Sequence, residues 1–347
     1  MLGSTIPFRR MWVCMTTFII RRILYLIPTV FLISVISFAL INAPPGDILT
    51  SQIDELEQQF GSAAERQIAN LRERYGLDQP VYMRYIPWMR GILTRGDFGM
   101  SFSGAYGIEY RPVADILWER LPYTILLSLV TLGFTYVVAI PVAVFSAVRQ
   151  RSFFDYVFTF LAFIGRSTPN FLLALVLMFF FYTRFGWSLG GMFSVQYIAA
   201  PWSWARFLNF LQHLVIPVIV IGTAGMAMVV RVLRATMLDE LGKDYVDTAR
   251  AKGISEWRVI WTHPTKVAIL PIVSTIGWML PMVFSGSVIT AIVLNLPTIG
   301  LVLYRALRAQ DMYLAGSCVL IFSVLTVIGT LISDILLAKI DPRIRYD

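Results

Sequence analysis

No group of side chains in this 347-residue sequence has the composition and spacing of a catalytic site. The phosphate-binding pattern G-x-x-x-x-G-K-[S/T] does not occur: Gly91 and Gly96 have its glycine spacing, but Asp97 follows instead of lysine. Neither G-x-S-x-G nor H-E-x-x-H occurs. There are only two histidines and two cysteines, Cys14 and Cys318. We therefore expect no enzyme activity, and no metal or cofactor bound by the chain itself.

Arg166 is a candidate functional residue because it lies within an otherwise uncharged block, 156–183. A charge inside a membrane span generally faces the bundle interior or an aqueous path, because contact with lipid is costly. We interpret Arg166, Ser167 and Pro169 as a candidate translocation-pathway stretch in which the proline kinks a helix. The alternatives are an internal ion pair, a side chain that extends to the membrane surface, and a simple kink.

The most polar segment of the second half of the chain is 245–271. Its first part predicts a short helix, since four residues recur on one face: Leu238, Leu241, Tyr245 and Thr248. Acidic residues come early and basic residues late (Asp239, Glu240, Arg250, Lys252), which suits the helix dipole. Gly253 then suits a left-handed turn. A second helix is expected from Ser255 through Trp261, ended by His263-Pro264.

This segment resembles the cytoplasmic coupling loop of ABC-importer permeases, and specifically the oligopeptide/dipeptide branch. The resemblance rests on Asp247-Thr248-Ala249, the phrase Thr-Ala-Arg-Ala-Lys-Gly (248–253) and the later Leu270-Pro271. Asp247-Thr248 departs from the usual Glu-Ala, and Pro264 replaces a small helix former. Further phrases are similar to the same branch in the same order, so the resemblance covers nearly the whole chain: 44–47, 75–80, 96–101, 167–171, 295–301 and 340–346.

The resemblance implies an all-α integral membrane protein with six transmembrane helices and a cytoplasmic coupling helix, over 244–253. The residues that would couple the chain to an ATPase are Tyr245, Asp247, Thr248, Ala249, Lys252 and Gly253. Small residues such as Ala249 and Ala251 would let the helix enter a cleft on another protein. The implied partners are a second homologous permease, two ABC ATPase subunits that bind ATP and Mg²⁺, and an extracytoplasmic substrate-binding protein.

The composition independently indicates a membrane protein. The chain is 57% hydrophobic and 14% charged, with a mean hydropathy of +0.69, which is unlike a soluble domain. Its net charge of +8 does not indicate nucleic acid, because the basic residues flank apolar segments and therefore have a topological role in the lipid bilayer.

Six apolar blocks predict the spans: 23–41, 121–148, 156–183, 214–230, 267–304 and 313–333. The fifth is too long for one span, so part of it is expected to be re-entrant or interfacial around 295–297. We thus expect a cytoplasmic N-terminus and first transmembrane helix (1–42) and an extracytoplasmic segment (43–120) with a helix over 51–75. A five-helix core (121–338) with the coupling loop at 231–266 and a cytoplasmic tail (339–347) would follow.

The basic residues predict the orientation. Lys and Arg are concentrated in the termini and in the loops 149–155 and 231–266, and short loops determine orientation most strongly. Both termini are therefore expected to be cytoplasmic, in a multi-pass protein of the bacterial cytoplasmic (inner) membrane.

The resemblance implies a permease subunit of an ATP-driven importer of short peptides or similar small solutes. Within the same family, oligosaccharides and nickel or opine-like compounds remain open as substrates. An ion-coupled secondary transporter is a separate alternative, which acidic residues inside the spans would favour, although none lies centrally in a span. A membrane scaffold without transport would leave the coupling phrase unexplained.

Overall fold

The computed structural model describes residues 8–42, 79–101, 111–284 and 288–340. The motifs at 44–47 and 341–346, the expected helix over 51–75 and most of the phrase at 75–80 lie outside the described residues. The chain divides into two compact units. The first unit contains 1–26, 125–296 and 325–347, and the second contains 27–124 and 297–324.

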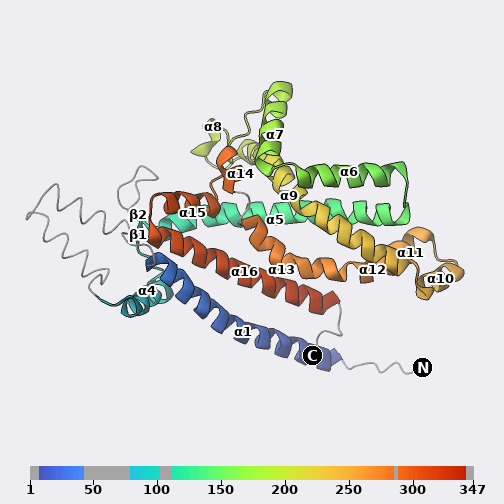
Figure 1. Cartoon of the computed structure of the whole chain (residues 1–347), viewed down its shortest axis with the longest axis horizontal. Coiled ribbons are helices and arrows are strands. Elements are labelled where there is room, and N and C mark those ends of the chain that lie inside the picture. The colour runs from blue at the N-terminus through green and yellow to red at the C-terminus, as the bar shows by residue number, and fades with distance from the viewer. Residues whose placement is uncertain (1–7, 43–78, 102–110, 285–287, 341–347) are drawn as a thin grey trace, which may run out of the picture. The chain divides into compact units, whose positions relative to one another are not determined.

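The described chain is almost entirely helical, as the sequence predicts, with one short antiparallel strand pair (Figure 1). The first half contains α1 (Phe8–Asn42), α4 (Val81–Arg95), β1 (Met100–Ser101), β2 (Arg111–Pro112), α5 (Val113–Val148), α6 (Phe153–Ser167) and α7 (Asn170–Phe185). The second half contains α8 (Val195–Ile198), α9 (Trp204–Leu241), α10 (Asp244–Ala251), α11 (Glu256–Thr262), α12 (Pro264–Ala268), α13 (Leu270–Phe284), α14 (Val288–Val293), α15 (Ile299–Arg308) and α16 (Met312–Ile340).

Four of the described helices are long and apolar enough to cross a membrane: α1, α5, α9 and α16. Two bent pairs also meet this test, α6 with α7 and the group α11–α12 with α13. The number reaches the six predicted spans if each bent pair is one span, judged by length and composition alone.

The second unit has its own apolar core, which contains both aromatic and aliphatic side chains. Phe38, Trp88 and Phe98 are buried there together with residues of α5, α15 and α16. Gly99 has a positive φ of 95°, and a Cβ added to it would lie 3.2 Å from Cδ1 of Tyr313. Next to it, the Ser101 hydroxyl donates a 2.6 Å hydrogen bond to the buried carboxylate of Asp311. The segment 96–101 is therefore a tightly packed turn that leads into β1.

The first unit is organised around α9, against which α6, α7, α12 and α13 all pack. Gly222 allows the close approach of α5, since a Cβ there would lie 2.7 Å from a ring carbon of Phe134. The hydroxyl of Thr135 donates a 3.2 Å hydrogen bond to the carbonyl of Gly222. α9 is longer than the predicted block 214–230, and it contains Asp239 and Glu240, which we had placed in the following short helix.

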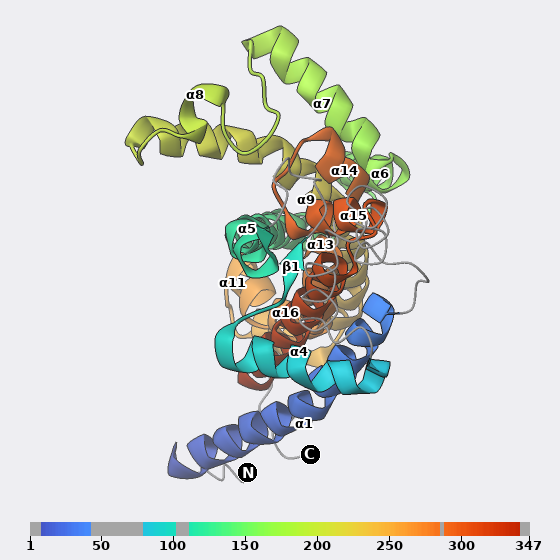
Figure 2. The ribbon, with the colours of Figure 1, turned by 90° about the vertical axis from the view of Figure 1, so that its left-hand side faces the viewer.

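The expected single kinked helix over 156–183 is wrong. α6 and α7 meet at an angle of 109°, and Figure 2 shows α7 projecting away from the end of α6. Thr168 leaves the helical conformation, and Pro169, which has no backbone N–H, precedes the first residue of α7. The proline therefore separates two helices rather than bending one.

The uncharged stretch 267–304 is divided among α12, α13, α14 and α15, so it does not form one span. The chain leaves the helical conformation between α14 and α15, where Asn295 has a positive φ of 49°, and this is the place where the sequence suggested an irregular segment. α16 continues six residues past Asp334, whose carboxylate lies 3.3 Å from the guanidinium of Arg22. The Asp334 carboxylate thus forms an ion pair with the first helix.

Candidate coupling surface and translocation pathway

The start of α10 is held by a buried carboxylate at the end of α9. Glu240 is 9% exposed, and its Oε2 accepts a 2.6 Å hydrogen bond from the Tyr245 hydroxyl. The ammonium of Lys243 donates to its other oxygen. Burial together with this hydrogen bond raises the pKa of Tyr245 to about 12, so the phenol keeps its proton at physiological pH. Glu240 therefore fixes the direction in which α10 leaves α9.

Arg250 connects α10 to α11 on the solvent side. Its guanidinium lies 3.1 Å from Oδ1 of Asp247 and 2.9 Å from Oε1 of Glu256. All three side chains are substantially exposed, so each pair contributes at most about 1 kcal/mol to stability. The pair between Arg250 and Glu256 restrains the angle between α10 and α11.

The apolar side of α10 packs within the loop itself. Val246 and Ala249 are buried against Val259 of α11, with Ile254 packed beside them. Ala249, which we predicted to enter a cleft on a partner, is 5% exposed. Its small side chain lets α10 and α11 approach each other.

The remaining predicted coupling residues lie on the outer side of α10 or in the turn after it. Asp247, Thr248 and Lys252 are exposed, Tyr245 is 37% exposed, and Ala251 is exposed as well. Gly253 has a φ of 74°, the left-handed conformation that the sequence predicts. The structure thus brings five of the six predicted residues to one short polar surface, which we call the coupling surface (Tyr245, Asp247, Thr248, Lys252, Gly253, with Ala251).

The coupling surface is attached firmly to α9. α11 leads into α12 across His263, and the hydroxyl of Thr265 donates a 2.7 Å hydrogen bond to the carbonyl of Ile260. The hydroxyl of Thr236 in α9 lies 3.1 Å from the carbonyl of Ala268 in α12. α10 and α11 are therefore connected to α9 through α12.

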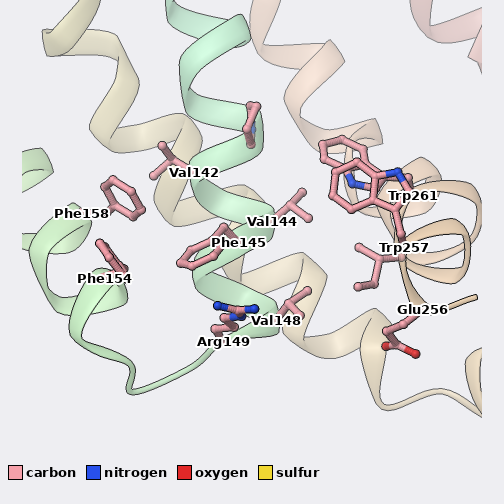
Figure 3. A pocket seen from close by; sticks show the side chains of 12 residues that line it. Val142, Val144, Phe145, Val148, Arg149, Phe154, Phe158, Glu256, Trp257 and Trp261 are labelled. Carbon is pink, nitrogen blue, oxygen red and sulfur yellow. The ribbon is translucent and has the colours of Figure 1, made fainter.

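An apolar pocket of about 810 Å³ lies beside α11 in the first unit. Figure 3 shows Phe154 and Phe158 of α6 on one side of α5, and Trp257 and Trp261 of α11 on the other. The ring centroids of the two indoles are 5.4 Å apart. Aromatic side chains of this kind commonly lie at the boundary between hydrocarbon and water. This part of the loop is therefore suited to contact with the membrane interface.

The predicted pathway residues meet at the break between α6 and α7. Arg166 is in the last turn of α6, Ser167 ends that helix, and Pro169 precedes α7. All three are exposed in the chain. Arg166 also lines a smaller pocket that includes Arg231 and Arg234 of α9.

One buried ion pair was missed by the sequence reasoning. Asp155 of α6 is 4% exposed, and its Oδ2 lies 2.9 Å from the guanidinium of Arg234. The backbone N–H of Asp155 donates to the hydroxyl of Ser152, which precedes α6. The pattern Ser152-x-x-Asp155 is a helix-start signal that could have predicted the beginning of α6. The partner on α9, seventy-nine residues away, has no local signal.

Comparison with known proteins agrees with these features. The model of the family "Binding-protein-dependent transport system inner membrane component" matches residues 139–346, and the corresponding N-terminal model matches residues 15–128. The oligopeptide transport system permease protein AppB of Bacillus subtilis is 36% identical over 332 residues, which cover 96% of this chain and 100% of that protein. The dipeptide transport system permease protein DppB of Escherichia coli K12 is 31% identical over 350 residues, 96% of this chain and 99% of that protein. The chain therefore belongs to the family of inner membrane components of binding-protein-dependent transport systems.

Proposed function

We propose that this chain is the permease subunit of an ATP-driven importer that takes up short peptides delivered by a substrate-binding protein. The observation that carries the substrate class is the full-length similarity to proteins named as oligopeptide and dipeptide permeases. Membership of the family supports the dependence on a binding protein and on an ATPase.

The coupling surface supports a specific contact with the ATPase. The apolar side of α10 is buried against α11. Its polar side, with Asp247 and Thr248, and Lys252 after it are exposed and could contact a partner. In this proposal, ATP and Mg²⁺ bind in two partner ATPase subunits. Closure of those subunits moves α10, and α9 passes the movement to the spans of this chain and of a second, homologous permease.

The test begins with purification of the tagged full chain from its native host in mild detergent and identification of its stoichiometric companions. We expect two P-loop ATPases per assembly and a second multi-span permease. Recovery of the chain alone, folded and stable, would contradict the importer and favour a self-contained transporter.

The substrate is then tested by reconstituting the assembly with its binding protein in liposomes that contain ATP. We expect import of radiolabelled short peptides and no import of oligosaccharides of similar mass. Import of the sugars alone would replace the peptide assignment and leave the coupling proposal intact.

A further inference from the structure

A basic pocket lies between α6 and α9 of the first unit. Its volume is about 320 Å³, and three of its lining residues are arginines: Arg166, Arg231 and Arg234. The space between the two helices is kept open by small residues on both, Ala162, Ala227 and Ala235. The three arginines of this pocket distinguish it from the pocket beside α11, whose charged lining residues are one arginine and one glutamate, Arg149 and Glu256.

Arg234 has a structural role in this pocket. Its guanidinium lies 2.9 Å from the carboxylate of Asp155, whose side chain is 6% exposed. The same carboxylate oxygen accepts a 3.0 Å hydrogen bond from the backbone N–H of Arg151. The charge of Arg234 is therefore balanced by a buried acid, and the pair joins α6 to α9.

The charges of Arg231 and Arg166 are not balanced by a nearby acidic side chain in the described part of the chain. Among the residues that the structure describes, no carboxylate lies within ion-pair distance of either guanidinium. The guanidinium of Arg231 is 5.9 Å from the ring centroid of Phe163, a contact that orients a cation without neutralising it. The pocket therefore carries two net positive charges.

These charges are distributed along the helix axis. Arg166 is eleven residues beyond Asp155 on α6, which corresponds to about 16 Å at the rise of an α-helix. Arg234 pairs with Asp155, so Arg166 lies well away from that pair, towards the break between α6 and α7. Unbalanced charges within an apolar helix pair are costly unless they face water or an anion. The pocket is open enough to admit either.

We propose that Arg166 and Arg231 bind an anionic oxygen group, the carboxylate of the solute in transit, in this pocket between α6 and α9. The planar guanidinium donates two parallel hydrogen bonds to a carboxylate, which suits arginine better than lysine for this task. This inference rests on the proposed function and deepens it: the transported peptides carry a free C-terminal carboxylate. The phosphate of an anionic phospholipid has the same chemistry, so the test must separate the two sources.

The experiment uses the complete assembly with its binding protein, reconstituted in liposomes of phosphatidylcholine. Import of a short peptide is compared with import of the same peptide as its C-terminal amide, each at saturating loaded binding protein so that capture does not limit the rate. The variants are R166Q, R231Q and R166K, and ATPase activity is measured in parallel as a check on folding and assembly. R184Q is the matched control, because Arg184 is an exposed arginine at the end of α7 that does not line the pocket.

We expect R166Q and R231Q to lower import of the free-carboxylate peptide by about ten-fold, as for loss of a charge-assisted hydrogen bond. Import of the amide should change little, R166K should retain part of the rate, and R184Q should resemble the unaltered chain. Equal loss for both peptides, or no loss for either, would overturn the carboxylate site.

A second set of liposomes contains phosphatidylglycerol as well. If the variants lose activity only in these vesicles, and equally for both peptides, the pocket binds a lipid phosphate and the proposal is overturned. If the unaltered assembly imports neither peptide, the proposed function itself fails, and the carboxylate site fails with it.

Discussion

Gly242 and Gly253 stand at opposite ends of α10, and each has open space where a Cβ would be placed. They differ in backbone conformation. Gly253 has a φ of 74°, which L-residues with a side chain rarely adopt, whereas Gly242 has a φ of −86°, which they adopt readily. The requirement for glycine at residue 253 is therefore conformational and independent of any partner.

This pair gives a matched test at the residue scale. G253A should destabilise the turn by about 1 kcal/mol, because the left-handed conformation is unfavourable for alanine. The opening constant of α10 amides, measured by hydrogen exchange in the purified protein, should rise roughly five-fold. G242A should leave it nearly unchanged. Equal effects of the two substitutions would show that φ is not the cause.

At the scale of elements, α10 has two sides with different tasks. Val246 and Ala249 pack against α11, and the outer side carries Thr248 and Ala251. In the proposed function, folding of the loop and docking of a partner would therefore depend on different residues, although both alanines had been predicted to enter a partner.

Leucine substitutions at the two alanines separate these tasks. A249L should overpack the contact with α11 and destabilise the loop by about 1–3 kcal/mol, which hydrogen exchange of α10 in the isolated chain would detect. A251L should leave the isolated chain unchanged but reduce recovery of the ATPase with the tagged chain. A251L with normal recovery and normal transport would contradict docking at the outer side.

The sequence predicted the kind of each major element but not always its limits. Gly253 and the uncharged blocks have local signals, so the short helix α10 and the main apolar helices were predicted from the sequence. The break at Pro169 was foreseen only as a kink, because the 109° angle depends on how α6 and α7 each pack on α9. The pairs Asp155–Arg234 and Asp334–Arg22 join residues distant in sequence, for which a single sequence has no signal.

At the scale of the whole molecule, the proposed orientation places the coupling surface in the cytoplasm and the segment between α1 and α5 outside. This orientation is inferred from the concentration of Lys and Arg in the termini and in the short loops 149–155 and 231–266. Lys252 in the coupling surface and Thr94 in α4 are both exposed, so they are suitable reporters of the two sides.

Single cysteines would test this orientation. The native Cys14 and Cys318 are replaced by serine, and K252C and T94C are introduced one at a time. In intact spheroplasts, a membrane-impermeant maleimide should label T94C at once and K252C only after the membrane is permeabilised. The opposite pattern would invert the topology and exclude an ATPase at the coupling surface.

The length of α9 has a mechanical consequence. At its C-terminal end, Thr236 is tied to α12, and at its N-terminal end the side-chain oxygen of Asn209 accepts a 2.9 Å hydrogen bond from the backbone N–H of Ser194. Its 38 residues correspond to about 57 Å of helix, but Pro217 lies inside it and removes one backbone hydrogen bond. The part after this proline, 218–241, is about 36 Å long, so a tilt of about 5° at one end of this part displaces its other end by about 3 Å. A partner that barely rotates the short helix α10 can therefore shift the far end of this part of α9 by about the length of two covalent bonds.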